Sequence, residues 1–158
     1  MGTEFNLQNK IGVFQLSPEG RFGQKNLDVY NASTQQADII VYDAHQGDNQ
    51  KFILWYAKAG FYVLQAKHSG LVLDLTGWGG SGTVLCQYPY NGQDNQLWAI
   101  EKARYGLVYL TSKYNGLAVT VQGDAGQNRS RVVVEEKAGA GSDIQKFSLK
   151  IIEWADAK

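Results

Sequence analysis

The sequence predicts an all-β domain made of three similar units of short strands. Apolar residues come in runs of four to six, rich in β-branched and aromatic types and bounded by Gly, Asn, Asp and Ser. No 11-residue window carries the apolar stripe of an amphipathic helix. The same order of motifs recurs three times along the 158 residues, a length typical of one domain. Together these features predict a single domain with almost no helix.

The predicted strands follow one another with turn residues between them. In chain order the clearest are 13–16, 27–29, 39–42, 51–55, 61–65, 71–75, 97–100, 107–110, 117–121, 131–134 and 146–149. About four strand candidates fall in each unit, which gives twelve in the whole domain. Short strands with glycine-rich turns are typical of sandwiches, barrels and trefoils, and the internal repetition decides among these.

Each unit contains a glutamine followed two residues later by an aromatic residue. The three motifs are Gln50-Lys51-Phe52, Gln96-Leu97-Trp98 and Gln145-Lys146-Phe147. An apolar–polar–apolar triplet stands upstream of each motif, centred on Asp28, Asp74 and Thr120, at distances of 22, 22 and 25 residues from the glutamine. A single unit would leave an apolar face in water, so the three units must bury it jointly around one pseudo-threefold axis.

This spacing sets the predicted domain boundaries. One domain covers 10–153, with repeats of about 10–57, 58–103 and 104–153. Residues 1–9 form a predicted N-terminal extension, part of which resembles a cloning remnant, and 154–158 form a C-terminal tail. The first residues lack the basic and apolar segments of a secretory signal. A cytosolic protein and a module cut from a larger secreted chain therefore both remain open.

The three Gln-x-Trp/Phe motifs and the Leu-Asp-Val-like strands before them resemble the ricin B-type β-trefoil lectins and carbohydrate-binding modules. The resemblance is clearest in the second repeat, which reads Leu73-Asp74-Leu75, then Tyr88-Pro89-Tyr90-Asn91, then Asp94-Asn95-Gln96-Leu97-Trp98. It spans nearly the whole chain. It implies a β-trefoil of twelve short strands in three pseudo-threefold repeats, and it implies glycan binding without catalysis.

Members of that family bind a sugar in a shallow pocket, at most one per repeat. The resemblance implies that an Asp accepts bonds from two sugar hydroxyls, an aromatic residue stacks on the sugar's C–H face, an Asn donates to a hydroxyl, and the motif Gln supports the Asp. In the first two repeats the Tyr follows the Asp by 14 residues and the Asn follows the Tyr by 7. His45 and Asn91 occupy equivalent loop positions beside the two pockets. The candidate sugar-binding residues are Asp28, Tyr42, His45, Asn49 and Gln50 in the first repeat, and Asp74, Tyr88, Asn91, Asn95 and Gln96 in the second.

Each candidate also has a purely structural interpretation. The aspartates could cap turns, the tyrosines could be half-buried strand residues, and His45 and Asn91 could be solvated loop residues. For the motif glutamines the structural role is the favoured one. Trp78 stands at the tip of the glycine-rich turn 77–82 and is a further candidate to extend the second pocket.

The third repeat departs from the pattern. Thr120 stands where the Asp is expected, Ile144 replaces the Asn, and the strand 132–136 offers no aromatic residue at the stacking position. Gln145 and Phe147 survive, as expected if the core role is kept while sugar binding is lost. A glutamine that the family often has before the stacking residue is also missing from the first two repeats, where Ile40 and Cys86 stand instead.

Composition and charge exclude several classes of function. Lys+Arg and Asp+Glu are both 15, which argues against general binding to nucleic acid or anionic lipid. No run approaches the ~18 apolar residues of a membrane span, so membrane insertion is not expected. One Cys cannot form an internal disulfide or a Cys-rich zinc site, and two distant His give no metal constellation. We expect no metal, no cofactor and no catalytic site.

The leading hypothesis is therefore a non-catalytic lectin with two sugar sites and a degenerate third. The family resemblance implies galactose- or N-acetylgalactosamine-type glycans, carried by glycoproteins or glycolipids. The alternative is a protein-binding trefoil, such as a protease inhibitor or a toxin-complex subunit, in which loops carry the function and the pockets are vestigial. The sequence leaves the oligomeric state and the exact glycan open.

Overall fold

The computed structural model describes residues 9–138 and 144–155, and these form an all-β domain without any α-helix. The predicted fold class is confirmed. Strand β1 begins at Asn9 and β12 ends at Trp154, while most of the predicted extension and tail falls on 1–8 and 156–158, outside the described residues. The twelve strands are β1 (Asn9–Pro18), β2 (Lys25–Val29), β3 (Ala37–Asp43), β4 (Phe52–Lys58), β5 (Phe61–Ala66), β6 (Val72–Leu75), β7 (Leu85–Tyr88), β8 (Trp98–Lys102), β9 (Val108–Ser112), β10 (Ala118–Val121), β11 (Val132–Glu135) and β12 (Phe147–Trp154).

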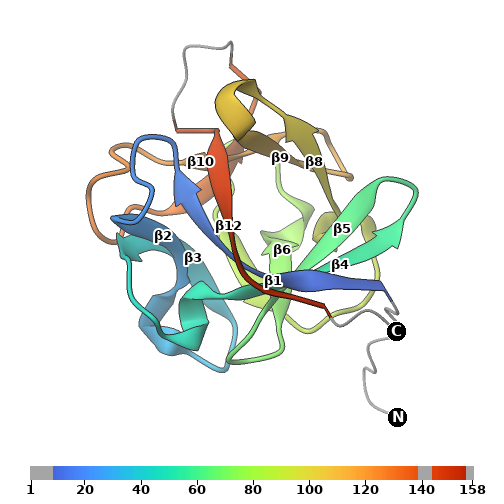
Figure 1. Ribbon diagram of the computed structural model, residues 1–158. Coiled ribbons are helices and arrows are strands. Elements are labelled where there is room, and N and C mark those ends of the chain that lie inside the picture. The colour runs from blue at the N-terminus through green and yellow to red at the C-terminus, as the bar shows by residue number, and fades with distance from the viewer. Residues whose placement is uncertain (1–8, 139–143, 156–158) are drawn as a thin grey trace.

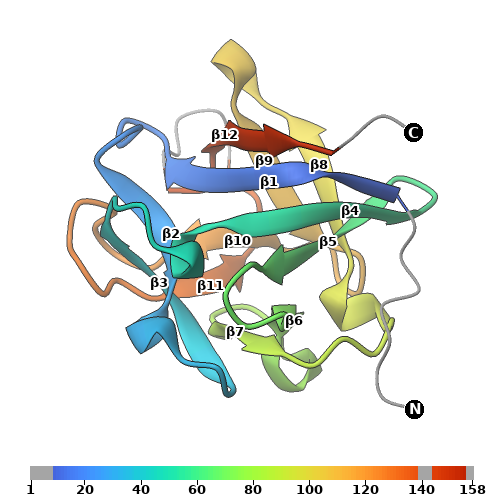
Figure 2. The same cartoon turned by 60° about the horizontal axis from the view of Figure 1, so that its bottom comes forward.

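Six of the strands close into an antiparallel barrel. Around the barrel, β1 pairs with β4, β4 with β5, β5 with β8, β8 with β9, β9 with β12, and β12 with β1. Figure 1 shows the first and last strands, β1 and β12, side by side at this closure. The other six strands form the hairpins β2–β3, β6–β7 and β10–β11. In Figure 2 the barrel strands β12, β1 and β4 lie in the upper half and two of these hairpins lie below them. A closed barrel leaves few exposed strand edges.

The barrel interior is filled by equivalent residues from the three repeats. The motif aromatics Phe52, Trp98 and Phe147 are at most 3% exposed. In β4 the buried Phe52 alternates with the partly exposed Ile53, as expected for a strand with one face in the core. The Trp98 indole also donates a hydrogen bond to the Leu73 carbonyl, with 3.2 Å between Nε1 and O. The three repeats therefore build one shared core, as their spacing predicts.

The motif glutamines of the first two repeats lie in short 3-10 turns rather than in the strands that follow. Gln50 closes the turn η2 (Asp48–Gln50), directly before β4, and Gln96 closes η4 (Asp94–Gln96), before β8. Both side chains are fully buried. The turn directs them back toward the hairpin of their own repeat, while the aromatic residue two positions later enters the barrel.

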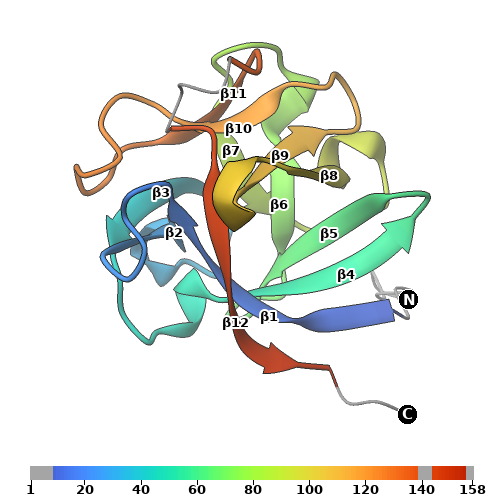
Figure 3. The ribbon, with the colours of Figure 1, turned by 45° about the horizontal axis from the view of Figure 1, so that its top comes forward.

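Each hairpin loop rests on the hairpin of the next repeat. The loop 122–131, between β10 and β11, bonds to β3 at Val41, whose N–H donates to the Ser130 carbonyl at 2.9 Å. The start of β3 pairs with β7, and the Gly82 N–H donates to the Val134 carbonyl of β11 at 2.7 Å. Figure 3 shows the three repeats as three sectors, with the orange loop of the third lying beside β3 of the first. This cyclic contact brings residues of two repeats together at each hairpin.

Candidate carbohydrate-binding sites

Two open pockets lie against the first two hairpins. The pocket at β2–β3 has a volume of about 260 Å³, and the pocket at β6–β7 has a volume of about 410 Å³. Among the predicted residues, Asp28, Tyr42, His45 and Asn49 line the first pocket, and Asp74, Tyr88, Asn91 and Asn95 line the second. The structure therefore brings together the residues that the sequence groups by spacing, while their role in binding a sugar stays a prediction.

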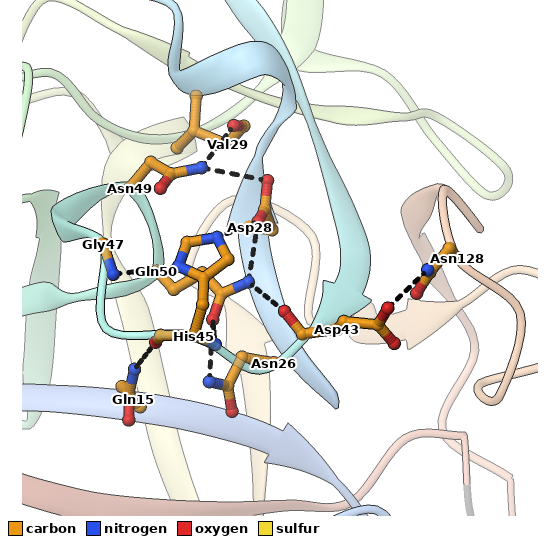
Figure 4. A network of polar contacts seen from close by, with 10 residues as sticks. All are labelled: Gln15, Asn26, Asp28, Val29, Asp43, His45, Gly47, Asn49, Gln50 and Asn128. Atoms are coloured by element: carbon orange, nitrogen blue, oxygen red, sulfur yellow. Dashed lines mark hydrogen bonds and ion pairs between the residues drawn. The ribbon is translucent and has the colours of Figure 1, made fainter. Parts of the chain in front are cut away.

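The carboxylate of Asp28 is buried at the base of the first pocket, where three side chains surround it (Figure 4). Asn49 Nδ2 donates to Oδ1 at 3.2 Å, and Gln50 Nε2 donates to Oδ2 at 2.8 Å. His45 Nε2 lies 3.6 Å from Oδ2. Asn49 Nδ2 also donates to the Val29 carbonyl at 3.2 Å, so both amide hydrogens are engaged and Oδ1 is the atom left open.

The second pocket repeats this arrangement nearly atom for atom. Asn95 Nδ2 donates to Asp74 Oδ1 at 3.3 Å and to the Leu75 carbonyl at 3.2 Å, and Gln96 Nε2 donates to Asp74 Oδ2 at 2.8 Å. Asn95 Oδ1 is buried and has no hydrogen-bond partner. Since a buried polar atom without a partner is costly, a ligand hydroxyl that donates to this oxygen would stabilise the site. The Cys86 thiol, 3.9 Å from Asp74 Oδ1, stands where the first pocket has Ile40.

The motif glutamines hold the pocket loops as well as the aspartates. Gln50 Nε2 donates to the Asp43 carbonyl, and its Oε1 accepts from the His45 N–H. Gln96 makes the matching bonds to the Pro89 carbonyl and the Asn91 N–H. The sequence favoured a structural role for these glutamines, and these contacts support it. Neither glutamine is among the residues that line a pocket.

The third repeat keeps the glutamine contacts and lacks the carboxylate. Gln145 Nε2 donates to the Thr120 hydroxyl at 3.1 Å and to the Glu136 carbonyl at 2.9 Å, and its Oε1 accepts from the Ala138 N–H. Thr120 donates its hydroxyl to the Ala118 carbonyl, so this group is already committed to the backbone. The stacking position is taken by Glu135, two residues after the partner of Thr120 in β11.

A Gln145→Ala variant is expected to lose about 1–3 kcal/mol of unfolding free energy, because it removes the three hydrogen bonds of a buried side chain, one of them to the buried Thr120 hydroxyl. Its galactoside binding is expected to equal that of the wild type. Gln96→Ala should lose a similar amount of stability and also weaken binding, because it frees the Asp74 carboxylate to rotate. Urea unfolding and galactoside titration of both variants measure the two effects. Equal binding in the two variants would contradict the supporting role of Gln96.

Burial raises the pKa of Asp28 and of Asp74 above the usual value of 3.8. Hydrogen bonds from Gln50 and Gln96 act in the opposite direction and limit the shift, because they favour the charged form. At Asp28 the nearby His45 also lowers the pKa. Two desolvated carboxylates are thus held at the floors of two open pockets, where each can accept hydrogen bonds from a ligand.

Acidification is expected to weaken the second pocket at a higher pH than an ordinary aspartate would. As the pH falls through the raised pKa of Asp74, the carboxylate is protonated and loses the charge that strengthens hydroxyl bonds. The contribution of Asp74 to folding stability depends on pH in the opposite direction. The raised pKa gives a stability contribution that is fully present below 3.8 and is lost as the pH rises through the folded-state pKa.

This prediction is tested by measuring galactoside affinity against pH in an Asp28→Thr variant, which isolates the second pocket. Near-UV circular dichroism of the same samples reports whether the chain stays folded. As the pH is lowered, the affinity is expected to be lost before the pH reaches 3.8, while the chain stays folded. Affinity that persists down to 3.8 would contradict the desolvated state of Asp74.

One wall of each pocket is a tyrosine. Tyr88 is 43% exposed, which leaves much of its ring open to a ligand, and Tyr42 is half-buried. The Arg129 guanidinium carbon lies 5.8 Å from the centre of the Tyr42 ring. An exposed ring beside a buried carboxylate can offer an apolar face and a polar anchor to the same ligand.

The pockets also contain residues that the sequence did not group with them. Arg129 of the third repeat lines the first pocket, and Gln36 of the first repeat lines the second. Trp78 lines the second pocket, as its position suggested, and packs edge-on against Tyr114 with 4.9 Å between ring centres. Arg129 and Gln36 reach these pockets because each hairpin loop rests on the hairpin of the next repeat. An alignment of the three loops in the sequence would have shown that the two residues occupy equivalent positions.

Residues 9–138 and 144–155 contain neither a metal-binding cluster nor a membrane-spanning helix. No group of three or more His, Cys, Asp or Glu side chains in these ranges is arranged to hold a metal ion. None of the helical turns described there has the length or hydrophobicity needed to cross a membrane. Cys86 is a free, buried thiol, and its burial raises its pKa.

A six-stranded barrel with three capping hairpins and a threefold repeat defines the β-trefoil class. A family model described as ricin-type beta-trefoil lectin domain-like matches the chain over residues 4–88 and again over 48–135. Together these matches cover most of the chain. The chain therefore belongs to this ricin-type family of β-trefoil lectin domains.

Solved structures agree with this assignment. The designed threefold-symmetric protein ThreeFoil is 33% identical with a TM-score of 0.83, covering 89% of this chain and 99% of ThreeFoil. The Polyporus squamosus lectin is 21% identical with a TM-score of 0.76, covering 94% of this chain and 51% of that lectin. The C-terminal half of an earthworm R-type lectin is 14% identical with a TM-score of 0.67, covering 89% of this chain and 98% of that half. The two natural lectins show the shared fold alone, and no curated protein matches the chain.

Proposed function

We propose that the protein is a non-catalytic lectin that binds galactose-type sugars in its first and second repeats. The observation that carries this proposal is the matched set of Asp, Asn and Gln contacts at the floors of the two pockets. Two pockets formed by different repeats keep the same three residue types, Asp, Asn and Gln, in the same hydrogen-bonding arrangement. A vestigial pocket has no physical reason to keep a desolvated carboxylate.

The polar floor suits two neighbouring hydroxyls of one sugar. One hydroxyl donates to the aspartate carboxylate, and a second donates to the open Oδ1 of the neighbouring asparagine. This assigns the asparagine as an acceptor, whereas the family resemblance implies a donor, because its amide hydrogens are already bonded to Asp74 and Leu75 in the second pocket. The tyrosine ring then packs on the less polar C–H face of the sugar.

The electrostatics of the pockets favour binding over hydrolysis. Glycoside hydrolysis uses two carboxyl groups about 5–9.5 Å apart on either side of the scissile bond. Among the residues that line each pocket there is one carboxylate, Asp28 in the first and Asp74 in the second. A single acceptor at the pocket floor holds a sugar without supplying the acid and the base that cleavage needs.

The galactose preference rests on the family resemblance and on relatives. The earthworm lectin half was solved with GalNAc, and the Polyporus squamosus lectin with an epitope that contains galactose. A shallow site of this kind binds with a Kd of about 0.1–1 mM. Two such sites on one chain raise the apparent affinity for a surface that displays many glycans, so the partners are glycoproteins or glycolipids.

The proposal is tested by passing the protein over galactose-coupled agarose. Retention followed by elution with free galactose, and no elution with an equal concentration of glucose, is the expected result. A protein that flows through the column would count against the lectin and favour the protein-binding trefoil, in which exposed loops carry the function.

A further inference from the structure

We propose that the first pocket selects galactosides that carry an anionic group, a carboxylate or a sulfate ester, and that Arg129 binds this group. The second pocket, by this account, binds uncharged galactosides without such selectivity. The inference rests on the proposed function and names the sugar class that distinguishes its two sites. Four observations on Arg129 support it.

Arg129 lines the first pocket from a loop that is hydrogen-bonded to the first repeat. The loop 122–131 comes from the third repeat and lies against β3, as Figures 1 and 2 show. The Arg129 N–H donates to the Val41 carbonyl at 2.7 Å. The neighbouring Asn128 accepts from Lys25 Nζ at 2.7 Å and donates to Asp43 Oδ2 at 3.1 Å. These bonds hold the backbone of the loop against β3, and the exposed side chain of Arg129 lines the pocket.

The Arg129 guanidinium has no carboxylate partner in residues 9–138 and 144–155, unlike the cations around it. Arg131 pairs with Asp38, Lys25 with Asp43, and Arg21 with Asp124. The described contact of the Arg129 guanidinium is with the ring of Tyr42, on which the sugar is proposed to stack. A positive charge without a partner, beside the ring of a sugar site, is a suitable binding group for an anion on that sugar.

Arg129 also occupies a backbone conformation that disfavours it. Its φ is 72°, in the left-handed region that side chains other than glycine rarely adopt. The equivalent residue of the second repeat is Gly82, with φ 86°. An arginine held in a strained conformation that glycine would tolerate suggests that its side chain contributes something the fold does not require.

The two pockets differ in charge at an equivalent loop position. Residues 28, 74 and 120 pair with residues 40, 86 and 133 of the next strand. Four residues before each of these partners, the loop has Gln36 in the first repeat, Gly82 in the second and Arg129 in the third. Because each loop serves the next repeat, Arg129 faces the first pocket and Gln36 the second. The first pocket also has His45 where the second has Asn91. Arg129 thus gives the first pocket a positive charge where the second has the neutral Gln36.

An arginine suits carboxylate and sulfate alike. Its planar guanidinium presents paired N–H groups that match two oxygens of either anion, and it stays charged at every relevant pH. Asp28 would repel an anionic group placed at the pocket floor. The geometry therefore points to a ligand with hydroxyls toward Asp28 and its anionic group toward Arg129.

The test isolates each pocket and exchanges the selective residue. An Asp74→Thr variant reports the first pocket, and an Asp28→Thr variant reports the second. Each is titrated with methyl β-galactoside, with its 3-sulfate and 6-sulfate esters, and with methyl β-galacturonide, which distinguish the two anions and their positions. The matched second substitutions are Arg129→Gln in the first variant and Gln36→Arg in the second, so each pocket receives the other's residue.

In the Asp74→Thr variant at least one anionic galactoside is expected to bind about tenfold tighter than the neutral one, and added salt should reduce this ratio. Arg129→Gln should bring the ratio to about one, and Gln36→Arg should raise it in the second pocket. Arg129→Gly, which suits the positive φ, should also remove the preference while keeping the fold.

Two failures are distinguishable. If the neutral galactoside binds neither single variant, the proposed lectin function is wrong. If it binds, but the first pocket shows no anionic preference, or Arg129→Gln keeps one, the inference on Arg129 is wrong alone. Tighter neutral binding after Arg129→Gly, with no loss for the anionic sugars, would show that the arginine only obstructs the Tyr42 ring.

Discussion

Replacing Asp28 and Asp74 together by threonine is expected to abolish galactoside binding and to leave the chain folded. Each carboxylate lies at the floor of its pocket and is the proposed acceptor for a ligand hydroxyl. A charge-assisted hydrogen bond contributes about 1.5–3 kcal/mol, so losing the one that each carboxylate accepts from the sugar weakens a site by a factor of about 10 to 150. From a Kd of about 0.1–1 mM, binding would then be undetectable.

Threonine is chosen because the third repeat already carries it. Thr120 accepts the Gln145 side chain just as the aspartates accept Gln50 and Gln96, and it is buried in the same way. The substitution therefore keeps a partner for the glutamine that alanine would remove. Each single variant should retain one working pocket, so calorimetry or NMR titration should find one site per chain instead of two.

Thr120→Ala is the matched control for these variants. It alters the equivalent position of the third repeat and should leave both galactoside sites at their wild-type affinity, with a loss of about 1–3 kcal/mol of stability because the buried Gln145 amide loses its partner. A double variant that still binds galactoside with wild-type affinity would refute the assignment of the two carboxylates.

Replacing Trp98 by alanine is expected to give the largest loss of stability of any substitution considered, about 3–5 kcal/mol. Its side chain is fully buried in the barrel, and its indole donates to the Leu73 carbonyl. Alanine removes the apolar contacts, leaves a cavity that the closed barrel cannot collapse, and leaves that carbonyl without its partner. Urea unfolding followed by fluorescence and circular dichroism measures the change.

Two further variants provide reference values for this loss of stability. Trp98→Phe should cost much less than alanine, because phenylalanine fills the equivalent positions at Phe52 and Phe147. Trp154→Ala should change stability by at most about 1 kcal/mol, since Trp154 is 66% exposed and contacts Phe14 only edge-on. Similar losses for Trp98→Ala and Trp154→Ala would contradict the assignment of the motif aromatics to the core.

The sequence predicted the barrel and the pocket floors because their determinants are local and repeated. Asp28 and Gln50 lie within one repeat, and the same pair recurs at Asp74 and Gln96 with the same separation. Short apolar runs define the strands regardless of their partners. Because the three units must bury their apolar faces in one shared core, few arrangements of these strands are possible.

Other features depend on contacts that spacing within one repeat does not encode. Arg129 and Gln36 reach their pockets across a repeat boundary, through loops that rest on the next hairpin. The direction of the Asn95 amide follows from the nearby Leu75 carbonyl, which only the folded chain places there. Gln50 and Gln96 lie in 3-10 turns, a conformation that a strand-period pattern does not distinguish from the strand that follows.

Each of the two pockets is proposed to hold one sugar on a floor formed by Asp, Asn and Gln. The most direct test is a titration of the ¹⁵N-labelled protein with methyl β-galactoside, followed through the side-chain amide signals. Those of Asn49 and Asn95 should shift and saturate, while that of Gln145 in the third repeat stays fixed. If the Asn49 and Asn95 amides stay fixed at saturating sugar, or the shifts fall on other surfaces of the domain, the account is wrong.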